Sequence, residues 1–373
     1  MALKDSQTKM YDHSEVKVRL LKLYLERYLN IMNSLSYIKA IHLFDMFCGE
    51  GVYYNGGKGS PLQILEVIKS IHEKSNGNKT MPINCLFNDI EKWKTDKLQN
   101  EIASKALHNK EMGKLEFSNE DYKNLLPNTV QFINKLKNEK AFVFIDPYGY
   151  KEIRMSDIRN LLTSKSSEVL LFLPTQFMFR FEEKGTPESL KEFISEIVPK
   201  DQWPKSETGI DFIEKLNDGF QNALGDDFFV DSFVITRDKN QFFCLFYFTS
   251  HIYGFDRMQD AKWEIDEEEG RGWQYEDDTN LFGGVAKTPN TFILERKLKE
   301  FLVNPKTNSD VYKFTLHQRH KPSHTNQVLL KLQAEKKIEV VNKDGSTARK
   351  SSFYLNYKAH KETPDKIQMK III

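Results

Sequence analysis

The segment "LFDMFCGEGVYYNGGKGSPLQILEVI" (residues 43–68) places five glycines and one lysine between a predicted strand and a predicted helix. A phosphate-binding P-loop requires G-x-x-x-x-G-K-[ST], but here Gly59 follows Lys58, and Val52 stands where the first glycine is required. A dinucleotide-binding loop requires G-x-G-x-x-G, but Tyr54 occupies the position of the third glycine. The pattern therefore favours a ligand without phosphate groups at the loop. S-adenosylmethionine is such a ligand.

Three aspartates come at or just after the ends of three successive predicted strands. Asp45 could accept a hydrogen bond from the ammonium group of that cofactor, Asp89 from its ribose hydroxyls, and Asp121 from its adenine amino group. Each aspartate alone is more often a helix cap or a surface acid. Because ligands of doubly wound sheets bind at the carboxyl ends of the strands, three acids in successive strand-end positions favour a cofactor site.

The tetrapeptide Asp146-Pro147-Tyr148-Gly149 follows a fourth predicted strand. Amino-group methyltransferases typically carry Asp/Asn-Pro-Pro-aromatic at this place, where the acid and a proline carbonyl accept hydrogen bonds from an exocyclic amino group and the aromatic ring stacks on the base. Such a site acts mainly by orientation and electrostatics. This sequence lacks the second proline and is similar to the motif of the tRNA guanine-N2 dimethyltransferases. A tight turn with a capping aspartate is the alternative interpretation.

Apolar segments of strand length alternate with helical segments, which predicts a mainly parallel, doubly wound α/β sheet. The helix after the glycine loop should begin with Ser60 as its N-cap and Pro61 as its first residue. Two apolar runs joined by a short turn predict an antiparallel hairpin at the end of the sheet. The expected strands lie at residues 37–47, 83–89, 113–119, 141–149, 167–175, 227–237 and 240–250.

Helices flank these strands, beginning with an amphipathic helix over residues 14–35. A helical insertion over about 177–227 is too long for an ordinary crossover. Phe177, Phe179 and Phe181 alternate at its start, where they could clamp a flipped base, although such alternation more often buries one face of a strand. The acidic residues 263–280 are interpreted as a solvated linker, with autoinhibition of the basic C-terminal region as a speculative role.

Residues 281–373 are predicted to form a winged helix-turn-helix domain after a first domain over 1–280. Helices expected at 291–303, 309–320 and 323–338 precede a β-hairpin expected at 339–357. From Val303 onward the chain has 14 Lys and Arg against 6 Asp and Glu, a net charge of +8. This charge favours binding of DNA or RNA with a steep salt dependence, and protein docking is the alternative. The candidate nucleic-acid contacts are His324, Asn326, Gln327 and Lys331 on the recognition helix and Lys343, Arg349 and Lys350 in the wing.

The glycine loop, "VFIDPYGYKEI", "FFCLFYFTSHIYGFDRMQDAKW" and "TNQVLLKLQAEKKIEV" together resemble the three-Cys-motif partner family, TcmP. The resemblance implies a class I S-adenosylmethionine-dependent methyltransferase-like domain with a Rossmann-like sheet, and a three-Cys-motif protein as a possible partner. It places Asp146, Pro147 and Tyr148 at the acceptor. It places the following residues at the cofactor: Asp45, Phe47, Gly49, Gly51, Asp89 and Asp121.

These features predict a methyltransferase that modifies a nitrogen of a nucleic acid base. A non-catalytic or partner-dependent adaptor is the competing hypothesis, because the doubled proline is missing. A protein methyltransferase is a weaker third possibility, since it would leave the basic winged helix without a role.

Other classes of protein are disfavoured by composition. Cys48, Cys85 and Cys244 are too far apart in sequence for a zinc or redox motif, so no metal is expected, and Cys48 is interpreted as a packing residue. The apolar runs are too short to span a bilayer, and the N-terminal residues do not resemble a signal peptide. We therefore expect a soluble, cytoplasmic protein with no membrane partner.

Overall fold

The computed structural model describes residues 12–75, 80–147, 153–176, 178–179, 188–197, 206–238, 241–274 and 287–372. The chain divides into two compact units, one comprising the chain to His251 together with Trp273 and Gln274, and the other including Ile252–Gly272 and the chain from residue 287 onward. Helix α10 (Ile252–Ile265) thus precedes the expected boundary at residue 280 but belongs to the second unit. Tyr312 donates a 2.7 Å hydrogen bond to Asp256 of this helix, and such buried contacts explain the grouping.

The first unit contains an eight-stranded sheet in the order β3-β2-β1-β4-β5-β7-β6-β8. Strands β1 to β5 run parallel, and β7 is antiparallel to both β5 and β6. This confirms the predicted doubly wound sheet with an antiparallel terminal hairpin. The strands are β1 Ala40–Asp45, β2 Ile83–Asn88, β3 Leu115–Ser118, β4 Glu139–Ile145, β5 Ser167–Leu173, β6 Phe229–Asp238, β7 Gln241–Thr249 and β8 Gly272–Gln274.

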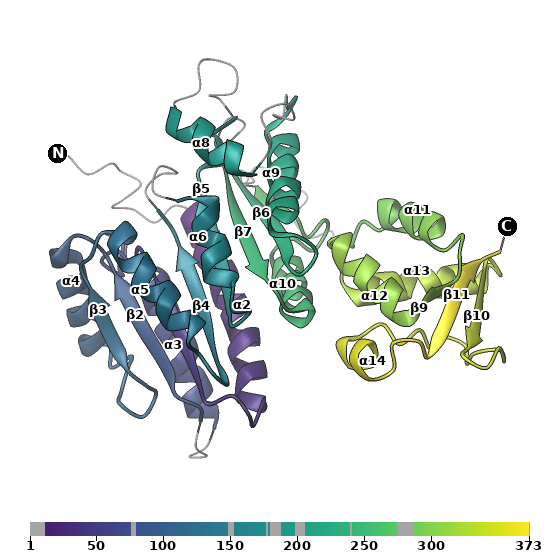
Figure 1. Ribbon diagram of the computed structural model, residues 1–373, viewed down its shortest axis with the longest axis horizontal. Coiled ribbons are helices and arrows are strands. Elements are labelled where there is room, and N and C mark those ends of the chain that lie inside the picture. The colour runs from purple at the N-terminus through teal and green to yellow at the C-terminus, as the bar shows by residue number, and fades with distance from the viewer. Residues whose placement is uncertain are drawn as a thin grey trace. The chain divides into compact units, whose positions relative to one another are not determined.

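Helices cover both faces of this sheet (Figure 1). Phe142 of β4 contacts the rings of Tyr24 and Tyr28, while its neighbour Val143 belongs to a core shared with the helices on the other face. Because successive side chains of a strand point to opposite faces, both faces of β4 are buried. The helices are α2 Asp12–Ser34, α3 Ser60–Lys74 and α4 Lys92–Ser104, and then α5 Tyr122–Asn134, α6 Met155–Leu162, α8 Glu188–Ile197 and α9 Gly209–Leu224.

The described part of the expected helical insertion forms α8 and α9, whose Phe193, Phe212 and Phe220 are buried in the core. Phe179 lies in a helical turn before α8, and its ring is 5.9 Å from each of the rings of Phe212 and Phe242. Phe179 therefore packs against the core, whereas Phe177 and Phe181 lie outside the described residues.

In the second unit the three predicted helices are present, with an additional helix before them, a short strand between the first two, and another helix before the last strand. Its elements are α10, α11 Phe292–Phe301, β9 Lys306–Thr307, α12 Asn308–His317, α13 Pro322–Ala334, β10 Ile338–Asn342, α14 Tyr357–Glu362 and β11 Ile367–Ile371. The partner strand of β10 is β11. The predicted hairpin over residues 339–357 is reduced to one isolated antiparallel bridge between Val341 and Thr347. Ser351 and Tyr354 have φ values of 62° and 54°, which interrupt an extended backbone there.

The acidic segment after α10 is folded over residues 266–272. The Asp266 carboxylate accepts hydrogen bonds from the backbone N–H groups of Glu269, Arg271 and Gly272 at 3.0, 2.9 and 3.1 Å. The expectation of a solvated linker is therefore wrong for this part, because its first acid organises a turn. No helix in the described part of the chain is long and apolar enough to cross a membrane.

Candidate functional site

The carboxyl ends of the parallel strands bring the predicted acids to one edge of the sheet. Asp45, the last residue of β1, pairs in register with Phe87 of β2 and Phe144 of β4. Asp89 follows the end of β2, and Asp146 follows the end of β4. The expected cofactor acids and the expected acceptor acid therefore meet around β1, where doubly wound sheets bind ligands.

Asp45 joins the glycine loop to the helix that follows it. Its carboxylate accepts hydrogen bonds from the Ser60 hydroxyl at 2.6 Å and from the backbone N–H of Phe47 at 3.3 Å. Gly59 is the N-cap of α3, so the predicted capping role of Ser60 is wrong, and its hydroxyl binds Asp45. Burial raises the pKa of Asp45 to about 7, which makes this carboxyl responsive to a nearby positive charge.

The glycine loop requires glycine where it turns. Gly49 and Gly51 have φ values of +62° and +77°, in the left-handed region that side chains disfavour. A Cβ on Gly51 would lie 2.4 Å from Leu98 Cδ1, whereas a Cβ on Gly49 would meet no atom within 4 Å. The loop is thus packed against α4 at Gly51 and has open space at Gly49, where a ligand can approach the backbone.

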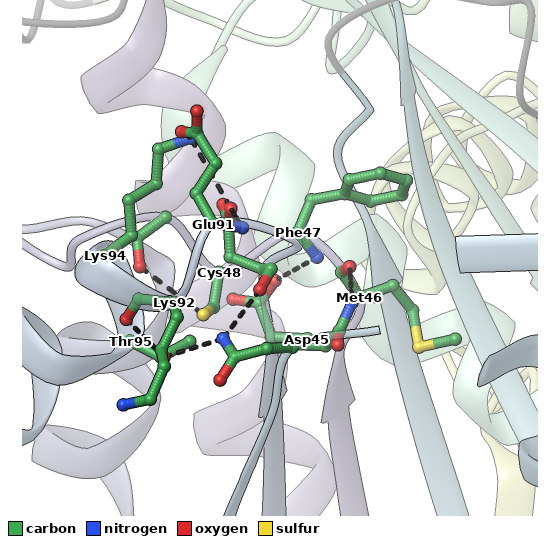
Figure 2. A network of polar contacts seen from close by, with 12 residues as sticks. Asp45, Met46, Phe47, Cys48, Glu91, Lys92, Lys94 and Thr95 are labelled. Atoms are coloured by element: carbon green, nitrogen blue, oxygen red, sulfur yellow. Dashed lines mark hydrogen bonds and ion pairs between the residues drawn. The ribbon is translucent and has the colours of Figure 1, made fainter. Parts of the chain in front are cut away.

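A polar network connects this loop to the end of β2 (Figure 2). The Cys48 N–H donates to the carbonyl of Asn88 at 2.7 Å, and the Asn88 amide donates to the carbonyl of Met46 at 3.1 Å. Burial raises the pKa of the Cys48 thiol well above its usual range, so this cysteine is a packing residue and not a thiolate.

Asp89, the predicted ribose acceptor, is 2% exposed and lies close to the ammonium group of Lys94. The Glu91 N–H donates to Asp89 Oδ1 at 3.0 Å, and Lys94 Nζ lies 3.5 Å from the same oxygen and 2.6 Å from Glu91 Oε2. Sequence reasoning missed Lys94, whose place in the first turn of α4, shortly after Asp89, was the available signal. The neighbouring Ile90 is 59% exposed and gives this end of the site an apolar surface.

Asp121, the predicted adenine acceptor, serves as the N-cap of α5. Its carboxylate accepts a 2.8 Å hydrogen bond from the Lys123 N–H, which is the capping alternative raised by the sequence. The next residue, Tyr122, stacks on Phe47 of the glycine loop with ring centroids 5.3 Å apart. The stack brings the start of α5 against the loop that carries the other predicted cofactor residues.

Asp146 forms an ion pair that the sequence did not predict. Lys17 of α2 donates a hydrogen bond to Asp146 Oδ2, and its Nζ lies 4.5 Å from the centroid of the Phe172 ring. Burial is the largest single effect on Lys17 and disfavours its charge, but the surrounding groups, Asp146 first among them, together outweigh burial and raise the pKa of Lys17. Pro147 is buried beside this pair, and Tyr148 lies outside the described residues.

In the second unit, the predicted nucleic-acid contacts differ in exposure. His324 is 4% exposed and its ring meets Trp263 edge-on with centroids 4.2 Å apart, so burial lowers its pKa to about 4. It is therefore part of the core and not a surface contact, contrary to expectation. The other predicted contacts are partly or fully exposed: Asn326, Gln327, Lys331, Lys343, Arg349 and Lys350.

Two of the exposed lysines have acidic partners. Lys331 Nζ lies 2.9 Å from Glu295 Oε2, and Lys343 Nζ lies 2.5 Å from Asp365 Oδ2. Such exposed pairs are weak, so both lysines can exchange partners with a phosphate at small cost. Across the part of the chain that the structure describes, no cluster of His, Cys, Asp and Glu is arranged to hold a metal ion.

The order of helices and strands in the second unit agrees with its sequence family. Residues 266–345 match the family model of the GMT-like winged helix-turn-helix (wHTH) domain. No curated protein matches the chain.

Solved structures with a similar first unit include methyltransferases. The Legionella pneumophila protein LPL1258 (DUF519) is 12% identical, covers 67% of this chain and 90% of its own, and gives a TM-score of 0.41. An O-methyltransferase from Bacillus cereus, in complex with SAH, is 12% identical over 66% of this chain and 92% of its own, with a TM-score of 0.32. A SAM-dependent methyltransferase from Agrobacterium tumefaciens is 11% identical over 64% of this chain and 62% of its own, with a TM-score of 0.33. At such low similarity, the function of this chain has to be argued from its own residues.

Proposed function

We propose that the first unit is an S-adenosylmethionine-dependent methyltransferase that modifies a nitrogen of a nucleic acid base. The observation that carries the proposal is the meeting of a phosphate-independent glycine loop with Asp45 and Asp146 at adjoining strand ends. One carboxylate is then available for the cofactor and another for the acceptor, which is the minimum that methyl transfer to an amino group requires.

The residues at the glycine loop fit the cofactor. The open space beside Gly49 allows close approach to the backbone, Asp45 would bind the ammonium group, and Asp89 would accept hydrogen bonds from the ribose. When bound, S-adenosylmethionine supplies a methyl group carried on a positively charged sulfur. Phe47 and Asp121 adjoin this region through the contact of Phe47 with Tyr122 and would line the adenine side.

On the acceptor side, Asp146 would orient the reacting nitrogen. Lys17 occupies Oδ2 of this carboxylate, so Oδ1 is the oxygen that would accept a hydrogen bond from an amino group. The nitrogen that receives the methyl group would lose one proton, which Asp146 could accept and pass to water. Fixed orientation of this kind contributes to rate without a strong base.

The second unit supports a nucleic acid as the substrate. Winged helix domains present a recognition helix and a wing to DNA, and here Gln327 on α13 and Arg349 and Lys350 beyond β10 are exposed. The net charge of +8 from Val303 onward suits a polyanion. Asn326, Lys331 and Lys343 complete the proposed contact set.

The test is transfer of a tritiated methyl group from S-adenosylmethionine to DNA, tRNA and ribosomal RNA. Asp146→Asn keeps the size of the side chain and removes its charge, so we expect the rate to fall by about 10²–10³-fold. Cofactor affinity, measured by calorimetry, should be unchanged. The matched control is Asp227→Asn, since Asp227 is an exposed acid paired only with Lys165 among the contacts of the described residues. Full activity of the Asp146 variant would disprove the assignment.

A partner-dependent adaptor is the second candidate, and the single proline beside Asp146 favours it. In that case the protein binds S-adenosylmethionine but transfers no methyl group until a three-Cys-motif protein is added. The resemblance to the TcmP family, which motivates this partner, stays a prediction. Transfer by the purified protein alone would exclude this alternative.

A further inference from the structure

Lys17 is a buried cation placed directly behind the proposed acceptor carboxylate. It is 7% exposed, although lysine is rarely buried unless it is paired. It comes from the first turns of α2, which are 129 residues away from Asp146 in sequence. Val16 and Val18 on either side of it are 6% and 2% exposed, so this part of α2 is held in the core.

The surroundings of Lys17 keep its ammonium group in place. Asp146 accepts its hydrogen bond, and the face of the Phe172 ring lies 4.5 Å from Nζ, a distance at which a cation is attracted to a ring. Asp45 adds a favourable electrostatic interaction when it is ionised. A lysine held in this way carries its charge throughout the physiological pH range, so it is a fixed cation and not a base.

A fixed cation at this point sets the orientation of the acceptor carboxylate. Its hydrogen bond uses Oδ2 of Asp146 and leaves Oδ1 for the acceptor. Because a charge-assisted hydrogen bond is roughly twice as strong as a neutral one, Lys17 holds the carboxylate in one orientation more firmly than a neutral donor could.

We propose that Lys17 is a positioning residue, which holds Asp146 by its Oδ2 so that Oδ1 is presented to the acceptor nitrogen. This inference rests on the proposed function and deepens it, because it names the residue that holds the acceptor carboxylate. It assigns to the first helix a role in the site, beyond covering the sheet.

The experiment compares three variants of the full chain. Lys17→Met removes both the charge and the hydrogen bond, Lys17→Gln removes the charge and keeps a donor, and Lys17→Arg keeps both. For each variant, kcat and KM are measured with the nucleic acid substrate, and the Kd of S-adenosylmethionine is measured by calorimetry.

We expect Lys17→Met and Lys17→Gln to lower kcat by about 30–100-fold, with cofactor Kd within about twofold of wild type, and Lys17→Arg to recover at least a tenfold part of that loss. Unchanged kcat in Lys17→Gln would overturn the proposal even if Lys17→Met fails to fold.

Asp146→Asn, assayed in parallel, separates the two hypotheses. If this variant is inactive while Lys17→Gln is fully active, the proposed function stands and the role of Lys17 is wrong. If Asp146→Asn is fully active, the acceptor assignment fails, and the role of Lys17 fails with it.

Discussion

At the scale of the residue, the proposed role of Asp45 would couple cofactor binding to pH. Its pKa is raised to about 7 by burial, so part of the protein carries a neutral Asp45 near neutral pH. The cationic cofactor prefers the ionised carboxylate and lowers this pKa when it binds. Binding therefore releases a proton, and affinity must rise with pH until Asp45 is ionised in the free protein.

We predict that the Kd of S-adenosylmethionine falls by about tenfold between pH 6 and pH 7.5, which corresponds to one ionisation near pH 7. Calorimetric titration over this range measures the change. Asp45→Asn should bind more weakly and lose most of the pH dependence, because the titrating group is gone. An equally strong pH dependence in Asp45→Asn would contradict the assignment of Asp45.

The sequence predicts the residues whose position depends on local pattern. Asp45, Gly49 and Gly51 follow from a strand, a turn and a helix start that lie within one short segment. Lys17 could not be found this way, because its partner Asp146 is 129 residues distant and only the assembled sheet brings them together. The burial of a polar side chain could not be predicted either. His324 is next in sequence to polar residues of α13, but its ring packs against Trp263 of α10, a helix that was not expected in that unit.

At the scale of the element, the glycine loop and α4 form one packed piece. Gly51 has a positive φ and no room for a Cβ because of Leu98, whereas Gly49 has a positive φ with open space. A side chain at Gly49 would add only backbone strain, whereas one at Gly51 would add both backbone strain and a steric clash with Leu98. Both glycines lie in the loop that would contact the cofactor, so both also report on binding.

Gly51→Ala is predicted to destabilise the protein by about 2–4 kcal/mol, and Gly49→Ala by about 1 kcal/mol, because only the first adds overpacking to backbone strain. Chemical denaturation followed by circular dichroism gives both values. The Gly49 variant is the control for strain alone. Equal losses of stability in the two variants would show that Leu98 moves aside and that the loop is not packed tightly against α4.

Strand pairing was predicted correctly for the β6–β7 hairpin and incorrectly for β10. The β6–β7 hairpin was predicted from two adjacent apolar runs and is present. In the second unit, β10 was expected to pair with residues just beyond the wing, yet α14 intervenes and β11 is the partner. Phe353 and Leu355 are buried but do not belong to a strand. Their apolar character therefore indicated burial in the core and not pairing in a β-sheet.

At the scale of the whole molecule, charge is divided between the ends of the chain. The region from Val303 onward carries a net charge of +8, while the total is +1. A polyanion would therefore be attracted by the second unit, while the chemistry proposed here belongs to the first. Binding and methyl transfer should consequently be separable by substitution.

We predict that the double variant Arg349→Glu, Lys350→Glu weakens binding of nucleic acid by at least about tenfold at moderate salt and lowers the slope of log K against log salt by about 2, because two phosphate contacts are lost. Fluorescence anisotropy at several salt concentrations measures both. The affinity for S-adenosylmethionine should not change. The matched control is Lys135→Glu, Lys137→Glu, which reverses two exposed charges before β4, at the edge of the sheet opposite the proposed site. If both double variants weaken binding equally, the second unit is not the specific nucleic-acid surface, and protein docking becomes the better account of the winged helix.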